Sequence, residues 1–210
     1  VINHAGGIDE SKISREPYTK LLLGHDYLLL RKEFFNAPET SKKIAGIHSV
    51  LLCFGGADPD NFTQKVVNFL KNSNFKVTII VGALYNQLET LMQSIVDDSN
   101  MKVLNNLNAD SIKEIMDTSD IAIVPSSTMG LEAFVSNMIV ITGMTAENQR
   151  NIYKGLVKED TVIGISNFSD LSRSYLLEQI KRASEKFTNY LFISKNEHND
   201  NILNLYNSLK

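Results

Sequence analysis

The stretch Val-Leu-Leu-Cys-Phe-Gly-Gly-Ala-Asp-Pro-Asp, residues 50–60, joins a continuous apolar run to a glycine pair. A second stretch of similar build, Ile-Ala-Ile-Val-Pro-Ser-Ser-Thr-Met-Gly, occupies residues 121–130. Short apolar runs without polar alternation are typical of strands that helices cover on both faces of a parallel sheet. Gly, Ser and Thr directly after such a run are typical of a turn that leads into a helix. The two stretches therefore predict an α/β fold.

The same pattern continues along the chain after residue 49, where short apolar runs alternate with longer segments whose apolar residues recur at helical spacing. Such alternation predicts βαβ units and a Rossmann-like, doubly wound parallel sheet of about six strands. The expected strands are residues 50–54, 76–81, 102–104, 121–124, 138–142 and 161–165. The expected helices are residues 61–73, 86–97, 110–118, 129–136, 146–157, 170–187 and 199–209.

In a doubly wound sheet, ligands bind beyond the carboxyl ends of the strands, at the point where the strand order reverses. In the usual order this point lies between the first and fourth strands, so the loops after residues 54 and 124 are expected to face one crevice. Gly-Gly allows a ligand to approach the backbone, and each loop leads into a helix whose N-terminus favours an anion. The candidate binding residues are Gly55, Gly56 and Ala57 in the first loop and Ser126, Ser127 and Thr128 in the second.

Three further side chains are expected at the rim of this crevice. Glu132 lies in the helix after the second loop, where its carboxylate could accept hydrogen bonds from ribose hydroxyls; a glutamate in a first helical turn is also common without any ligand. Asn148 and Gln149 follow the fifth strand and could reach a sugar or a phosphate, or simply be exposed beside a helix cap at Thr145. The two loops themselves could likewise be only a tight turn and an N-cap cluster.

Composition excludes several classes of function. The 210-residue chain has a net charge of -3 and no basic patch, so we expect no nucleic-acid partner. No apolar run is long enough to span a membrane. The single cysteine lies in an apolar run, which indicates a buried thiol and fits a reducing cytoplasm. The four histidines lack metal-binding spacing, no Gly-x-Gly-x-x-Gly or Walker motif is present, and we expect neither a metal nor another cofactor.

Residues 1–47 differ from the rest of the chain. They contain a strand candidate at residues 20–24, a second apolar run at residues 27–31 and Pro38. The first three residues, Val-Ile-Asn, read as the end of a strand that leads into the Gly6-Gly7 turn. We therefore expect residues 1–47 to be a connector and the remnant of an N-terminal domain, and residues 48–210 to be the Rossmann-like domain.

Four segments, in order, resemble motifs of the UDP-sugar hydrolases of pseudaminic acid biosynthesis. Leu-Gly-His-Asp-Tyr-Leu-Leu-Leu-Arg-Lys-Glu-Phe at residues 23–34 resembles their interdomain motif, and Phe-Gly-Gly-Ala-Asp-Pro at residues 54–59 resembles their glycine loop. Ser-Ser-Thr-Met-Gly-Leu-Glu at residues 126–132 is similar to their G-S-T-x-W-E, and residues 146–149 match their A-E-N-Q.

This resemblance implies the C-terminal half of a GT-B architecture, as in MurG-type glycosyltransferases, with UDP-sugar as the ligand. It implies that Gly55, Gly56, Ser127 and Thr128 hold the diphosphate, that Glu132 holds the ribose, and that Asn148 and Gln149 line the sugar end. The chain departs from the family at Ala57 and His25, where Ser and Pro are usual, and it lacks the family's Gly-x-Gly-His motif.

No residue of this chain is therefore assigned as a catalytic base. Three hypotheses follow. The chain is the UDP-binding half of a nucleotide-sugar hydrolase, inactive alone, or the same half of a GT-B glycosyltransferase, or a non-catalytic module that binds a nucleotide sugar.

Overall fold

The computed structural model describes residues 1–34 and 41–193 and the single residues 201, 204 and 207. Its main body is a six-stranded, wholly parallel sheet in the order β6-β5-β4-β7-β8-β9. These strands are β4 (Ser49–Cys53), β5 (Lys76–Val81), β6 (Met101–Asn105), β7 (Ile121–Pro125), β8 (Ile139–Met144) and β9 (Val162–Asn167). Their order confirms the predicted doubly wound fold and places the loops after β4 and β7 side by side.

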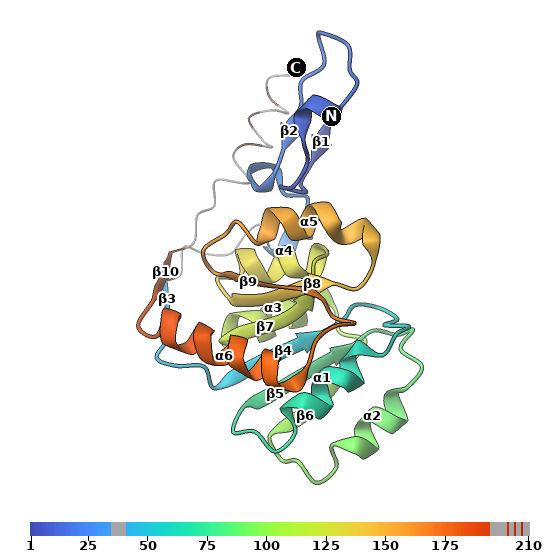
Figure 1. Cartoon of the computed structure of the whole chain (residues 1–210), viewed down its shortest axis with the longest axis vertical. Helices are drawn as coiled ribbons and strands as arrows, with labels where there is room; N and C mark the ends of the chain where they lie inside the picture. Colours follow the sequence, from blue (N-terminus) through green and yellow to red (C-terminus); the bar gives the residue numbers. More distant parts are fainter. Residues whose placement is uncertain (35–40, 194–200, 202–203, 205–206, 208–210) are drawn as a thin grey trace.

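Helices cover both faces of this sheet (Figure 1). They are α1 (Phe62–Leu70), α2 (Leu88–Ser94), α3 (Ala109–Thr118), α4 (Thr128–Val135), α5 (Arg150–Leu156) and α6 (Arg173–Phe187). Helices α1, α2 and α6 share one hydrophobic cluster with the sheet, and α3, α4 and α5 share a second cluster. Alternate residues of β4 divide between the clusters, Leu52 entering the first and Leu51 the second, as the two-residue period of a strand requires.

The predicted elements of this body exist, but several are shorter than expected. The helix expected at residues 61–73 ends at Leu70, and the one expected at residues 86–97 is α2. The segment expected as one helix at residues 146–157 begins instead with a 3₁₀ turn, Glu147–Gln149, before α5. The helix expected at residues 199–209 lies almost wholly outside the described residues.

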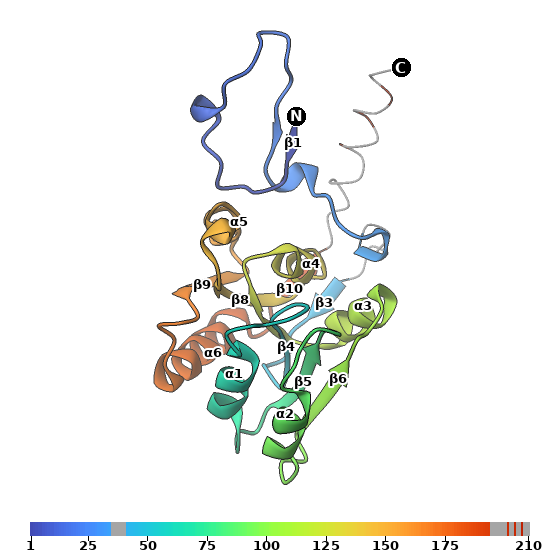
Figure 2. The ribbon, with the colours of Figure 1, turned by 90° about the vertical axis from the view of Figure 1, so that its right-hand side faces the viewer.

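Residues 1–34 form an arm whose first part extends from the sheet body next to α5 (Figures 1 and 2), whereas Leu28 and Phe34 are buried in the second hydrophobic cluster. In it β1 (Ile2–Asn3) and β2 (Leu22–Leu23) pair in parallel, while the apolar run at residues 27–31 forms no strand. A second small pair joins β3 (Ser41–Lys43) to β10 (Leu191–Ile193) in antiparallel fashion. No helix within the described residues combines the length and the apolarity that crossing a bilayer requires.

Candidate nucleotide-binding crevice

A cavity of about 470 Å³ lies at the carboxyl ends of four neighbouring strands. With strands about 4.8 Å apart, the distance from the end of β6 to the end of β7 is about 14 Å. Every loop that leaves one of these strands contributes to the cavity, and Arg31 reaches it from the arm. The lining residues are Arg31, Cys53, Gly55, Gly56, Ile80, Val81, Gly82, Asn106, Leu107, Ile112, Ser127, Thr128, Met129 and Glu132.

The glycine loop after β4 is open toward solvent and supported from behind. Gly55 has a φ of 87°, a left-handed conformation that favours glycine. A Cβ built on Gly55 or on Gly56 meets no atom within 4 Å, so space beside this backbone is free. A Cβ on Gly82 would lie 2.4 Å from the Gly56 Cα, and Leu84 N–H donates to the Gly56 carbonyl oxygen at 3.2 Å. The loop after β5 therefore packs directly against the glycine loop.

The two helix N-termini at the crevice are not equivalent. The carboxylate of Asp58 accepts hydrogen bonds from the Phe62 and Thr63 N–H groups at 3.0 and 2.7 Å, and Asn61 caps Gln64. The expectation that the N-terminus of α1 favours a bound anion is therefore wrong, because a buried carboxylate of the protein already occupies it.

The N-terminus of α4 is the open one. Its N-cap residue, Ser127, makes no side-chain cap, and within the described part of the chain the N–H groups of Thr128 and Met129 have no acceptor. The Gly56 N–H likewise lacks a described acceptor. Backbone donors thus border the cavity from both sides of the point where the strand order reverses, which is the arrangement that an anionic group requires.

A bidentate ion pair adds charge to this cavity. Arg31 donates from Nε to Glu132 Oε1 and from Nη2 to Oε2, both at 2.7 Å. The Glu132 side chain is only 2% exposed, whereas Arg31 is 38% exposed. Hydrogen bonding to Glu132 raises the pKa of Arg31 above its ordinary value, and the guanidinium lies 5.1 Å from the centre of the Phe34 ring. Of five guanidinium N–H groups, three remain for a ligand.

The rest of the lining is mostly apolar. Its apolar residues come from four elements: Ile80 lies in β5, Leu107 follows β6, Ile112 lies in α3 and Met129 lies in α4. Cys53 is buried beneath the glycine loop, and burial raises the pKa of its thiol to about 11. This confirms the sequence interpretation of Cys53 as a buried thiol and leaves it an uncharged part of the wall.

The structure brings Gly55, Gly56, Ser127, Thr128 and Glu132 together at this cavity, and places the other candidates elsewhere. Ala57 is exposed in the glycine loop. Ser126 is fully buried, and its hydroxyl lies 3.0 Å from the Thr142 hydroxyl. Asn148 is exposed, while the Gln149 amide bonds Thr145 through both its oxygen and its nitrogen.

The sequence patterns gave no binding role to nine residues that line the cavity, among them Arg31, Gly82, Asn106 and Met129. Gly82 and Asn106 directly follow β5 and β6, so the rule that ligands bind beyond strand ends could have found them. Arg31 stands in the motif of residues 23–34, but its pairing with Glu132 spans 101 positions and leaves no periodic signal. Among the described residues no cluster of His, Cys, Asp or Glu suited to a metal ion occurs.

Comparison with known proteins gives one relative in sequence and several in structure. No protein-family profile matches the chain. The chain is 26% identical over 203 residues to the uncharacterized protein MJ1062 of Methanocaldococcus jannaschii, a match that covers 93% of this chain and 40% of that protein.

The structural relatives are glycosyltransferases. Acinetobacter baumannii MurG matches with a TM-score of 0.55 and 12% identity over 83% of this chain and 50% of its own length. The glycotransferase of kitacinnamycin matches with a TM-score of 0.51 and 15% identity over 77% of this chain and 42% of its own length. The E. coli heptosyltransferase WaaC, solved with ADP, matches with a TM-score of 0.50 and 13% identity over 66% of this chain and 45% of its own length.

At these identities the likeness concerns the fold. This chain has the Rossmann-like fold of the C-terminal domain of GT-B glycosyltransferases. It spans 40% of the length of MJ1062 and between 42% and 50% of the three solved chains.

Proposed function

We propose that the crevice binds the nucleoside diphosphate of a nucleotide sugar, and that this chain is the donor-binding part of a GT-B-type glycosyltransferase. The observation that carries the proposal is the set of N–H groups at Gly56, Thr128 and Met129, which have no acceptor among the described residues and border one cavity together with the Arg31 guanidinium. Backbone donors at a helix N-terminus and a guanidinium suit a diphosphate.

Each group has a place in this proposal. The diphosphate lies between the glycine loop and the N-terminus of α4, with Arg31 donating to it. Glu132 orients Arg31 and keeps a further lone pair on each oxygen for ribose hydroxyls. The apolar side chains of Leu107, Ile112 and Met129 form the wall for the base. Gln149, tied to Thr145, supports the loop after β8 at the sugar end.

The nucleotide that we propose is UDP, on the strength of the motifs at residues 23–34, 54–59, 126–132 and 146–149. We further propose that residues 1–47 connect this body to a second domain. Because no catalytic base is assigned in this chain, the chain alone is expected to bind a nucleotide sugar without consuming it.

Titration calorimetry with UDP tests the binding. Gly56→Val places a side chain in the open space beside the loop, so it should leave the fold intact and weaken binding by at least about tenfold, or 1.4 kcal/mol. Arg31→Ala should weaken binding similarly, whereas Arg15→Ala, which removes an arginine of an exposed ion pair, should not. Equal affinity in all three variants, or no heat at millimolar UDP, would contradict the proposal.

The second candidate is hydrolysis of a UDP-sugar, favoured by the resemblance of residues 54–59 and 146–149 to the pseudaminic acid hydrolases. The two candidates differ in whether the glycosyl group goes to an acceptor or to water. Product analysis with the complete protein, in ¹⁸O-labelled water, separates them: label in the free sugar supports hydrolysis, and an unlabelled glycoside supports transfer.

A further inference from the structure

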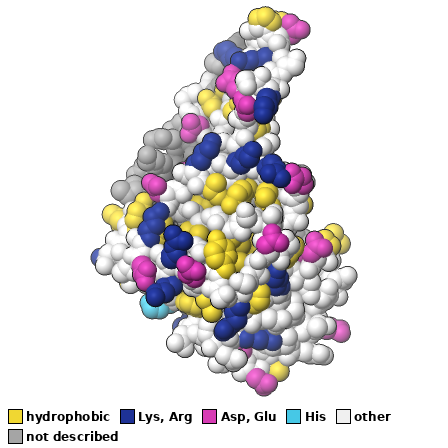
Figure 3. Space-filling view, in the orientation of Figure 1, with side chains coloured by type: hydrophobic (Ala, Val, Ile, Leu, Met, Phe, Trp, Pro, Cys, Tyr) yellow, Lys and Arg dark blue, Asp and Glu magenta, His cyan; other side chains and the backbone are white. Residues whose placement is uncertain are grey.

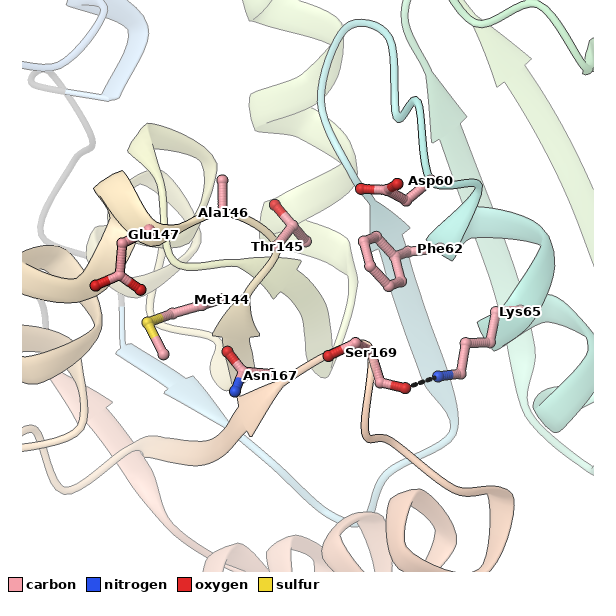
Figure 4. A pocket seen from close by; sticks show the side chains of 9 residues that line it. All are labelled: Asp60, Phe62, Lys65, Met144, Thr145, Ala146, Glu147, Asn167 and Ser169. Atoms are coloured by element: carbon pink, nitrogen blue, oxygen red, sulfur yellow. Dashed lines mark hydrogen bonds between the residues drawn. The ribbon is translucent and has the colours of Figure 1, made fainter.

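The six-stranded sheet has two edge strands, β9 and β6, and the outer side of β9 is largely closed by the chain itself. Val162 N–H donates to the Glu159 carbonyl oxygen at 3.0 Å, and Ser166 N–H donates to the Tyr153 hydroxyl at 3.1 Å. Just past β9, the Lys65 ammonium of α1 donates to two successive carbonyl oxygens at 2.8 and 2.7 Å (Figure 4). Both ends of this edge are therefore protected against pairing with another strand.

The outer side of β6 is open. The backbone groups of Asn100 and Asn106 bond β5. Since the N–H and C=O groups of successive residues alternate between the two sides of a strand, those of Met101, Val103 and Asn105 point away from the sheet. Among the described residues, only the Met101 N–H of this set has a partner, a carbonyl oxygen in the turn before the strand. Two donors and three acceptors therefore stay open along this edge.

Helix α2 presents apolar side chains next to the open edge. It leads from β5 to β6 and lies at the β6 end of the sheet (Figures 1 and 2). Gln64 of α1 donates to the Ser94 hydroxyl at 2.9 Å, so this side of α2 faces α1. Met92 lies about 200° around the helix from Ser94, on the side away from α1. Met92 is 55% exposed, and Val96, just past the end of α2, is 77% exposed.

The open groups of β6 are complementary to those of an identical strand that runs in the opposite direction. In antiparallel pairing centred on Val103, the two copies of Val103 exchange both of their hydrogen bonds. The Asn105 N–H of each copy then bonds the Met101 carbonyl oxygen of the other. Both open donors of each strand thus find an acceptor, and the Met101 N–H, which already has one, is not needed.

The helices and the charges agree with this pairing. A two-fold axis through the Val103 pair, perpendicular to the sheet, keeps both copies of α2 on the same face. With strands about 4.8 Å apart, helices above the gap between β5 and β6 lie about 10 Å apart, the distance at which helices pack. Charged side chains of both signs are mixed at the lower end of Figure 3, where β6 and α2 lie, so this end does not repel its own copy through charge of a single sign.

We propose that the chain forms a symmetric dimer in which β6 pairs in antiparallel fashion with β6 of a second copy, giving one continuous sheet. The arm lies at the opposite end of the sheet, clear of this interface (Figure 1). Lys102 is the one charged residue of β6, and the pairing sets its two copies diagonally across the axis, where they repel. The dimer is therefore weak, with a Kd of about 50 µM, and it tightens with salt. The inference does not depend on the proposed function.

Sedimentation equilibrium of the full chain, between about 5 and about 500 µM, tests the dimer: the average mass should rise from 23.5 kDa toward twice that value. Val103→Pro removes the donor at the axis without removing a bond to β5, so it should abolish association, whereas Val103→Thr should retain it. Met92→Lys should weaken association at least about tenfold, and Tyr18→Lys, which adds the same charge on the arm, should leave it unchanged. Lys102→Thr should tighten it about threefold.

A cross-link locates the contact. Residues of a hydrogen-bonded antiparallel pair have Cα atoms about 5.5 Å apart, within the range of a disulfide, and the buried Cys53 does not compete. Mild oxidation should therefore convert Val103→Cys into a covalent dimer and leave Tyr18→Cys monomeric. A mass of 23.5 kDa at all concentrations, association that survives both Val103→Pro and Met92→Lys, or absence of the cross-link would overturn the inference.

Discussion

Arg31 and Glu132 join two parts of the chain through one buried carboxylate. Removing one partner of a buried pair leaves the other charge without compensation, which costs more than the pair itself contributes. Here the carboxylate is buried and the guanidinium is partly exposed, so the two single substitutions are not equivalent. The pair also fixes the direction from which Arg31 enters the crevice, because both of its hydrogen bonds use the same edge of the guanidinium.

We expect Arg31→Met to lower the free energy of unfolding by about 2–4 kcal/mol, somewhat below the value for a fully buried pair because solvent screens the exposed guanidinium. Adding Glu132→Leu should restore part of this loss, since the uncompensated charge is gone. Urea titration of the two single variants and the double variant measures the coupling. Strictly additive effects would show that the two side chains do not stabilise each other.

Cys53 allows a second test at this scale. With a pKa of about 11, about one thiol in a thousand is ionised at pH 8, and the side chain is 2% exposed. We expect no reaction of the folded protein with a disulfide reagent at pH 8, and complete reaction in denaturant. Rapid labelling of the folded chain would mean that the glycine loop opens above Cys53.

At the scale of elements, the arm of residues 1–34 is held on α5 by backbone contacts. Gly7 N–H donates to the Asn151 carbonyl oxygen at 3.0 Å, and a Cβ on Gly155 would lie 2.7 Å from the Gly6 backbone. His25, whose side chain is 9% exposed, contacts Glu159 at 2.8 Å. A two-residue strand pair such as β1 and β2 has little stability of its own, so these contacts fix the first part of the arm. Leu28 and Phe34, which are buried in the second hydrophobic cluster, hold the segment that carries Arg31.

Gly155→Ala should therefore release the arm without unfolding the sheet. The added methyl group would overlap the Gly6 backbone, an overpacking that costs about 1–3 kcal/mol. Limited proteolysis should then cut within residues 8–20 faster than in the unaltered protein, while the sheet body survives. Lys181→Ala, an exposed change on α6, should leave the cleavage rate unchanged.

His4 makes the same arm sensitive to acid. Leu29 N–H donates to His4 Nδ1 at 3.2 Å, which requires an unprotonated nitrogen, and burial followed by the charge of His25 lowers the pKa of His4 below 6.5. Unfolded His4 thus binds its proton at higher pH than folded His4, so its contribution to stability is present above pH 6.5 and is lost as the pH falls through the folded pKa.

Hydrogen-exchange protection of the Leu29 amide should therefore decrease between about pH 7.5 and about pH 5. His4→Ala should have low protection throughout this range, and His48→Ala, away from the arm, should retain the dependence. Protection that is constant with pH in the unaltered protein would exclude this role of His4.

At the scale of the whole molecule, the sequence predicted what depends on local pattern and on the topology of parallel sheets. The apolar runs predicted the strands, and the usual strand order brought residues 55–56 and 127–128 together. The features that the sequence did not predict depend on backbone angles and side-chain directions, which leave no local sequence pattern. Asp58 caps α1 because Asp58 and Asn61 adopt left-handed φ values of 43° and 55°, and the hydroxyl of Ser126 turns inward to Thr142.

If the crevice binds UDP only in the folded protein, UDP binding should raise the free energy of unfolding of the sheet body. UDP at about 100 times its Kd should stabilise the native state by about 2.7 kcal/mol and raise Tm by about 5–11 °C for a chain of this size. Differential scanning fluorimetry measures this shift. Gly56→Val should keep the Tm of the free protein and lose the shift, whereas a lower Tm without UDP would mean that the substitution damages the fold.

The contact of Gly82 with Gly56 has a consequence for the rate of binding. Because Gly82, at the end of β5, packs against the Gly56 backbone, the glycine loop is already ordered before a ligand binds. The conformational entropy of this loop is therefore lost during folding and not during binding. Nucleotides should then associate at a rate that changes little between good and poor ligands, and the differences in affinity should appear in how long each complex lasts. A substitution of Gly82 would leave the glycine loop less ordered in the free protein, so the entropy cost of ordering it would fall on binding. The rate constant of nucleotide association should then decrease.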